Sequence, residues 1–199
     1  MARRTFFSFH YVPDVSRSYV VKNSQVVKDH EDAGFLDSSA FEKAKNENPE
    51  SLRRFLRKEM DGSSVVCVLI GASTASRPMV RFELLQGLWD GRGLLGIRIH
   101  TIKDLDQKTS SAGTNPFDVL GIYVADDKVY LTERLSISDQ WTYTTEFAQK
   151  VLPKWPYGST LPSSGTHAFS EFFSVYSWSG TAHSTIGDWI QAAATKAGR

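Results

Sequence analysis

Cysteine is almost absent from this chain of 199 residues, which contains only Cys67. A single cysteine cannot form a disulfide within the chain, so the fold does not depend on an oxidising compartment. Cys67 lies in the apolar run 65–70, where a cysteine serves as a small core residue and not as a nucleophile. No apolar stretch approaches the roughly 20 residues of a membrane helix, and the first residues have no signal-peptide pattern. We therefore expect a cytoplasmic protein with no membrane partner.

An excess of charge of one sign is also lacking, because 23 Lys and Arg residues stand against 22 Asp and Glu residues, for a net charge of +1. No strong field attracts nucleic acid, which is not expected as a partner. The histidines have no metal-ligand spacing, so we expect no metal site. The turn at 71–73 has neither the lysine of a phosphate-binding P-loop nor the GxSxG pattern of a hydrolase.

The first half of the chain alternates between strand-like and helix-like segments. Aromatic or continuous apolar runs are typical of buried parallel strands, which are expected at residues 4–10, 34–36, 65–70 and 94–99. Apolar residues spaced by three and four predict helices at residues 15–28, after the capping residues 37–39, at 49–60 and at 78–90. This alternation indicates an α/β fold of flavodoxin-like type, with a central parallel sheet and helices on both faces.

The second half departs from this rhythm. Residues 103–115 are a polar loop, and residues 121–133 alternate with a period of two around Asp126 and Asp127, which predicts an antiparallel hairpin. The remaining expectations are a short helix at 144–151, an aromatic-rich coil at 153–184 and a closing helix at 186–197. We therefore expect one domain over 1–199, with an α/β core at 1–125 and a C-terminal elaboration, residues 126–199, packed on it.

The ends of the predicted strands indicate where a ligand would bind. Ligands of open α/β sheets bind beyond the carboxyl ends of the strands, which selects the segments 8–14, 37–39 and 71–76. Glu83 follows the third segment on a helix stripe that it shares with Met79 and Gly87, four residues away on either side. We therefore expect one cleft, formed by Ser8, His10, Asp37, Ser73 and Glu83.

Five segments, in this order along the chain, resemble the TIR proteins of the bacterial Thoeris anti-phage system, the ThsB family. They are FFSFHY at 6–11, AGFLDSSAFEKAK at 33–45, SSVVCVLIG at 63–71, RPMVRFELLQG at 77–87 and NPFDVLG at 115–121. Each motif is short, and their shared order makes the resemblance specific. It covers roughly the first 125 residues and continues more loosely to the end.

The resemblance implies cleavage of NAD⁺, as substrate and not as cofactor, at the bond between nicotinamide and ribose. It implies a cyclic ADP-ribose isomer as product, which reaches a separate effector by diffusion, and it leaves open a phage-derived trigger and a homo-oligomer. The glutamate of the WxxxE motif of TIR enzymes corresponds to Glu83, which makes Glu83 the catalytic residue, while Met79 replaces the tryptophan. The substrate-binding residues implied are Ser8, Phe9, His10, Asp37, Ser73 and Met79.

The implied chemistry suits a single carboxylate. Nicotinamide leaves from a cationic ring and needs no acid, whereas the ribose develops oxocarbenium character that a carboxylate can stabilise. Two other functions stay open. The chain could be a non-catalytic TIR-like interaction module, which the change to Met79 favours, or another flavodoxin-like nucleotide enzyme, such as a nucleoside transferase, that uses the same cleft.

Overall fold

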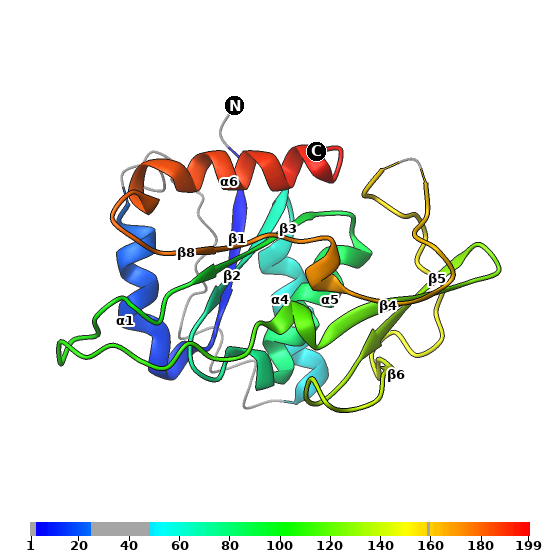
Figure 1. Ribbon diagram of the computed structural model, residues 1–199, viewed down its shortest axis with the longest axis horizontal. Helices are drawn as coiled ribbons and strands as arrows, with labels where there is room; N and C mark the ends of the chain where they lie inside the picture. The colour runs from blue at the N-terminus through cyan, green and yellow to red at the C-terminus, as the bar shows by residue number, and fades with distance from the viewer. Residues whose placement is uncertain (1–2, 25–47, 159) are drawn as a thin grey trace.

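The computed structural model describes residues 3–24, 48–158 and 160–199, and these form two four-stranded sheets. The first sheet is parallel, in the order β1-β2-β3-β8 (Figure 1). Its strands are β1 (Thr5–Phe9), β2 (Val65–Ile70), β3 (Gly93–Arg98) and β8 (Val175–Ser177). The strands predicted at 4–10, 65–70 and 94–99 are confirmed. The strand predicted at 34–36, the capping residues 37–39 with their helix, and Asp37 itself lie outside the described residues.

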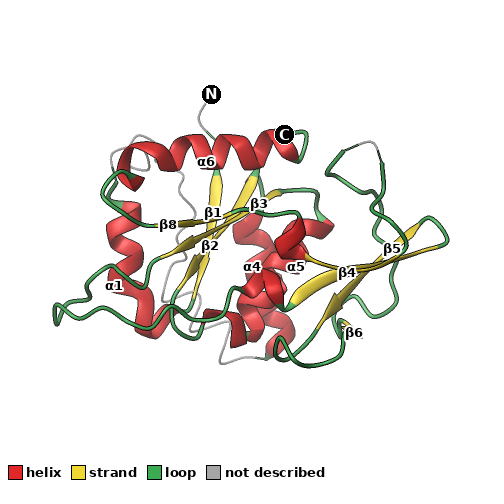
Figure 2. Ribbon diagram, in the orientation of Figure 1, coloured by secondary structure: helices red, strands yellow, loops and turns green. Residues whose placement is uncertain are grey.

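Helices cover both faces of this sheet, as the α/β pattern predicted (Figure 2). The six residues of β2 are all buried, because alternate side chains enter two different cores. Val66, Val68 and Ile70 pack with α4 (Pro49–Met60) and α5 (Pro78–Trp89). Val65, Cys67 and Leu69 pack on the other face, with α1 (Tyr11–Lys22) and α6 (Ala182–Lys196). Among the described ranges, no helix is long and apolar enough to cross a membrane.

Helix α1 begins four residues before the predicted start and ends at Lys22 instead of near residue 28. Pro13 and Asp14, which the sequence analysis placed before the helix, lie in its first turn. Proline fits there because the first N–H groups of a helix have no partner within the helix. Helices α4 and α5 follow the prediction closely. Each begins at a proline, and Asn48 caps α4 by accepting a hydrogen bond from the Ser51 N–H at 2.9 Å.

The second sheet is antiparallel, in the order β6-β5-β4-β7. Its strands are β4 (Leu120–Ala125), β5 (Lys128–Glu133), β6 (Thr142–Tyr143) and β7 (Gly165–Ala168). The predicted hairpin is confirmed, and both of its turn residues, Asp126 and Asp127, have positive φ, as a two-residue hairpin turn requires. The helix predicted at 144–151 is wrong. A turn occupies residues 146–149 of this segment, and Gln149 has a φ of 55°, which interrupts a right-handed helix.

The aromatic-rich segment 153–184 is more regular than expected, because it contains β7 and β8. Strand β8 pairs with β3 and therefore completes the parallel sheet from the C-terminal part of the chain. The two strands have four and three residues, too few for a period of two to be visible in the sequence. The closing helix is confirmed as α6, which begins four residues before the predicted start.

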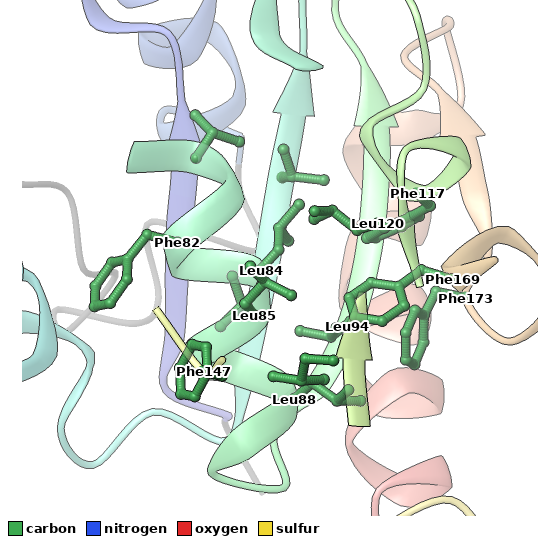
Figure 3. Close-up of a cluster of buried hydrophobic side chains, with 14 of the residues drawn as sticks. Phe82, Leu84, Leu85, Leu88, Leu94, Phe117, Leu120, Phe147, Phe169 and Phe173 are labelled. Atoms are coloured by element: carbon green, nitrogen blue, oxygen red, sulfur yellow. The ribbon is translucent and has the colours of Figure 1, made fainter. Parts of the chain in front are cut away.

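The two sheets share one core, which surrounds α5 (Figure 3). Leu84, Leu85 and Leu88 of α5 meet Leu94 of the parallel sheet and Leu120 of the antiparallel sheet there. Phe117, Phe169 and Phe173 pack against one another on one side of α5, and Phe147 lies on another side, against Trp89 (Figure 3). Helix α5 is consequently buried at every position from Val80 to Leu88. A polar side chain on this helix must therefore find its partner inside the protein.

Helix α6 lies close to the parallel sheet at Gly93, the first residue of β3. A Cβ atom at this position would overlap the backbone carbonyl of Ala193 on α6, and backbone cannot rotate away as a side chain can. We expect Gly93→Ala to lower the free energy of unfolding by about 2–4 kcal/mol. Urea denaturation measures the change, with Gly180→Ala as control because nothing lies within 4 Å of that position. Equal urea midpoints for the two variants would contradict the described packing.

Candidate functional site

Glu83 lies in the middle of α5 with its side chain directed at the parallel sheet, and only 4% of its surface is exposed. Its partner is Ser8 on β1, whose hydroxyl donates a hydrogen bond to Glu83 Oε2. Ser8 is next to the last residue of β1, pairs with Val68 of β2 and is itself buried. The structure therefore joins two of the predicted site residues, 75 positions apart in the sequence, near the carboxyl end of the sheet.

Burial controls the ionisation of Glu83. Removal of its carboxyl from water raises its pKa to about 8, while the hydrogen bond from Ser8 acts in the opposite direction and is the weaker effect. The carboxyl is therefore mostly protonated at neutral pH. A cation placed beside it would favour the carboxylate and return the pKa toward its ordinary range. Such a carboxyl responds to the charge of whatever binds next to it.

A second polar pair lies one step further along the same edge. His10 follows β1, and its ring nitrogen Nδ1 lies 3.0 Å from the hydroxyl oxygen of Ser73. Ser73 belongs to the turn that leads from β2 to the 3₁₀ turn η1 (Thr74–Ser76), and Thr74 Oγ1 fixes this turn by accepting a hydrogen bond from the Gly71 N–H at 2.9 Å. Partial burial and the nearby cation of Arg77 lower the pKa of His10, so its ring is neutral at pH 7.

Asp14 ends the predicted segment 8–14 but was not named among the predicted cleft residues, and it lies at this edge of the sheet. Its side chain is almost fully buried, and it occupies the space that a Cβ atom at Gly71 would need. Arg17, one turn later on α1, lies 3.6 Å from Asp14 Oδ1. Burial raises the pKa of Asp14, and Arg17 opposes this shift. Because α1 starts at Tyr11 and not at residue 15, Asp14 lies on the helix, next to the end of β2. A prediction with the right helix start would have placed the Asp14 carboxyl near the site.

The predicted residues Phe9 and Met79 lie apart from these two pairs. Phe9 belongs to the opposite face of the sheet, where it packs against the core under α1 and α6. Met79 lies one turn before Glu83 on α5 and is half-buried. It lines a groove of about 390 Å³ together with Pro78 and Phe82. Within the described ranges, no three acidic, histidine or cysteine side chains are grouped as in a metal site.

The fold and these polar pairs define the class of the protein. A parallel sheet with helices on both faces, in which a buried glutamate of the helix after β2 meets a serine of β1, is a TIR-like α/β domain of flavodoxin-like type. Residues 6–104 match the family described as "Thoeris protein ThsB, TIR-like domain".

A curated relative extends this similarity to most of the chain. The chain is 34% identical over 185 residues to a protein of Bacillus cereus (strain MSX-D12) named "Putative cyclic ADP-D-ribose synthase ThsB1". The alignment covers 89% of this chain and 93% of that relative. The chain belongs to the ThsB family of TIR-like proteins.

Proposed function

We propose that this chain cleaves NAD⁺ at the bond between nicotinamide and ribose, with Glu83 as the catalytic carboxylate, and closes the remaining ADP-ribose into a cyclic isomer. The observation that carries the proposal is the buried Ser8–Glu83 pair near the carboxyl end of the parallel sheet, where α/β folds bind their ligands. The name of the Bacillus cereus relative supports cyclic ADP-ribose as the class of product.

The environment of Glu83 suits a cationic substrate. The nicotinamide ring of NAD⁺ carries a positive charge, which favours the carboxylate form of Glu83 when the substrate binds. The carboxylate can then accept hydrogen bonds from the ribose hydroxyls and stabilise the positive charge that develops on the ribose as nicotinamide leaves. Ser8 orients the carboxyl before the substrate arrives. No acid is required, because nicotinamide departs as a neutral molecule.

The resemblance to Thoeris proteins also supports a signalling role for the product of this reaction. In this proposal the cyclic product is made in the cytoplasm and is a diffusible signal for a separate effector, and activity requires a phage-derived trigger or self-assembly. Ser73, His10 and Asp37 belong to the proposed binding region, and Phe9 does not, because it packs on the opposite face of the parallel sheet. Met79 offers an apolar wall without an aromatic face, so we expect it to hold the substrate less tightly than a tryptophan would.

The test is incubation of the purified chain with NAD⁺, alone and with lysate of phage-infected cells, followed by mass spectrometry. We expect free nicotinamide and a product one water lighter than ADP-ribose, and the Glu83→Gln variant gives the background of the lysate. Only linear ADP-ribose above that background would reduce the protein to an NAD⁺ hydrolase. No nicotinamide above background under either condition would instead favour the non-catalytic interaction module.

A further inference from the structure

The backbone sets the distance between the two polar pairs of the site, Ser8–Glu83 and His10–Ser73. Ser8 and His10 are two residues apart, and the backbone of His10 is still extended, with φ −80° and ψ 103°. Residues two apart on an extended chain project to the same face and are separated by roughly 6–7 Å. His10 therefore projects to the α5 face, as Ser8 does, and its contact with Ser73 in the turn before α5 agrees with this placement.

The two steps of the proposed reaction place different demands on the protein. Loss of nicotinamide needs charge stabilisation, which Glu83 supplies. Ring closure by a hydroxyl of the same nucleotide also needs a base, because the hydroxyl must lose its proton as its oxygen bonds to the ribose carbon. Glu83 is engaged with the reacting ribose at that moment. A second group, a few ångströms from Glu83 along the cleft, is therefore needed to accept the hydroxyl proton.

We propose that His10 is this general base, with Nε2 as the atom that accepts the proton and Ser73 as the residue that positions the ring. This inference rests on the proposed function and assigns its second step. When the C–O bond forms, the hydroxyl proton moves to Nε2 and the ring becomes an imidazolium, which then returns the proton to solvent. Nicotinamide has already left with the electron pair of the broken C–N bond.

The contacts of His10 fit this role. The hydrogen bond to Ser73 occupies Nδ1, and Nε2 has no hydrogen-bond partner among the described residues. With the proton on Nδ1, donated to the Ser73 oxygen, Nε2 keeps its lone pair free. The neighbouring charge of Arg77 favours the neutral ring, which is the form that can accept a proton. The side chain also makes no capping hydrogen bond to α1, so its replacement should leave the helix intact.

The experiment compares two yields from one reaction, nicotinamide and the ratio of cyclic to linear ADP-ribose. With His10→Ala and His10→Gln we expect the cyclic-to-linear ratio, compared at equal amounts of nicotinamide released, to fall about tenfold or more, because water replaces the unassisted hydroxyl. Ser73→Ala should give a smaller fall in the ratio, since the base remains but its orientation is lost. His183→Ala on α6 is the control, because His183 is exposed and its ring lies beside that of Trp178, away from the site.

A second readout does not depend on turnover. Nitrogen NMR of labelled protein should show the resting His10 ring protonated on Nδ1, and Ser73→Ala should change the balance between the two ring tautomers. A cyclic product with an unchanged ratio in both His10 variants would overturn the role of His10 and leave NAD⁺ cleavage standing. A cyclic product joined through a ring nitrogen would also overturn it, because such a nucleophile has no hydroxyl proton to lose. Absence of nicotinamide from the parent chain would overturn the proposed function together with this inference.

Discussion

Glu83→Gln is expected to lower the rate of NAD⁺ cleavage by about 10² to 10³ or more. Removal of one group directed at developing charge typically has this effect. Glutamine keeps the size of the side chain and can still accept the hydrogen bond from the Ser8 hydroxyl, so the packing of α5 should persist. Release of nicotinamide by the triggered enzyme measures the loss.

The matched control is Glu171→Gln, in which the exposed carboxylate beside His167 loses its charge. This variant should turn over NAD⁺ at the parent rate, because its residue lies in the 3₁₀ turn η3 (Phe169–Glu171) that follows the antiparallel sheet. If Glu83→Gln also retains nearly full activity, Glu83 is not the catalytic residue, and the Ser8–Glu83 pair is then only a buried polar contact of the core.

The Glu83→Gln substitution should also raise the free energy of unfolding at alkaline pH. The pKa of Glu83 is about 8 in the folded state and close to its ordinary 4.5 in the unfolded chain, so folding favours the proton-bound form. The protonated Glu83 carboxyl makes its full contribution to the free energy of unfolding below about pH 4.5. This contribution is lost as the pH rises through about 8. A difference of about 3.5 pKa units corresponds to about 5 kcal/mol at the alkaline end. Glutamine cannot ionise, so the Glu83→Gln variant does not lose this stability as the pH rises.

Thermal unfolding at two pH values tests this expectation. At pH 9 the Tm of Glu83→Gln should exceed that of the parent chain by about 10–20 °C, and at pH 5 the two values should lie within about 3 °C. Glu171→Gln again serves as the control, since burial affects that exposed carboxyl little and hydrogen bonds lower its pKa. An equal difference between the parent and Glu83→Gln at both pH values would show that packing, and not ionisation, separates them.

The sequence predicted the central elements of the fold because each carries either a continuous apolar run or apolar residues at helical spacing. The run 65–70 is apolar on both faces, and only a strand covered on both sides requires that. The contact between Ser8 and Glu83 also followed from the topology, since a strand end and the helix after the next strand meet at one edge of the sheet. The roles of these residues in binding and catalysis stay predictions.

Three features could not be predicted, for different physical reasons. Pro13 has the composition of a turn, yet a first helical turn tolerates it equally well. Strand β8 is too short to show a period and is held by its pairing with β3, which is a tertiary contact. The segment 144–151 has helical composition, but the left-handed backbone at Gln149 and the bridge between Val151 and Tyr130 prevail over local propensity.

The late position of β8 in the chain has a consequence for biosynthesis. A ribosome completes β1, β2 and β3 long before it reaches residue 175, and at about 5–20 residues per second the delay amounts to several seconds. During that interval one edge of β3 has no neighbour, and the apolar face that α6 later covers is open to other molecules. Nascent chains are therefore most prone to aggregation while the segment between β3 and β8 is being made, and a chaperone that shields this edge would raise the yield of folded protein.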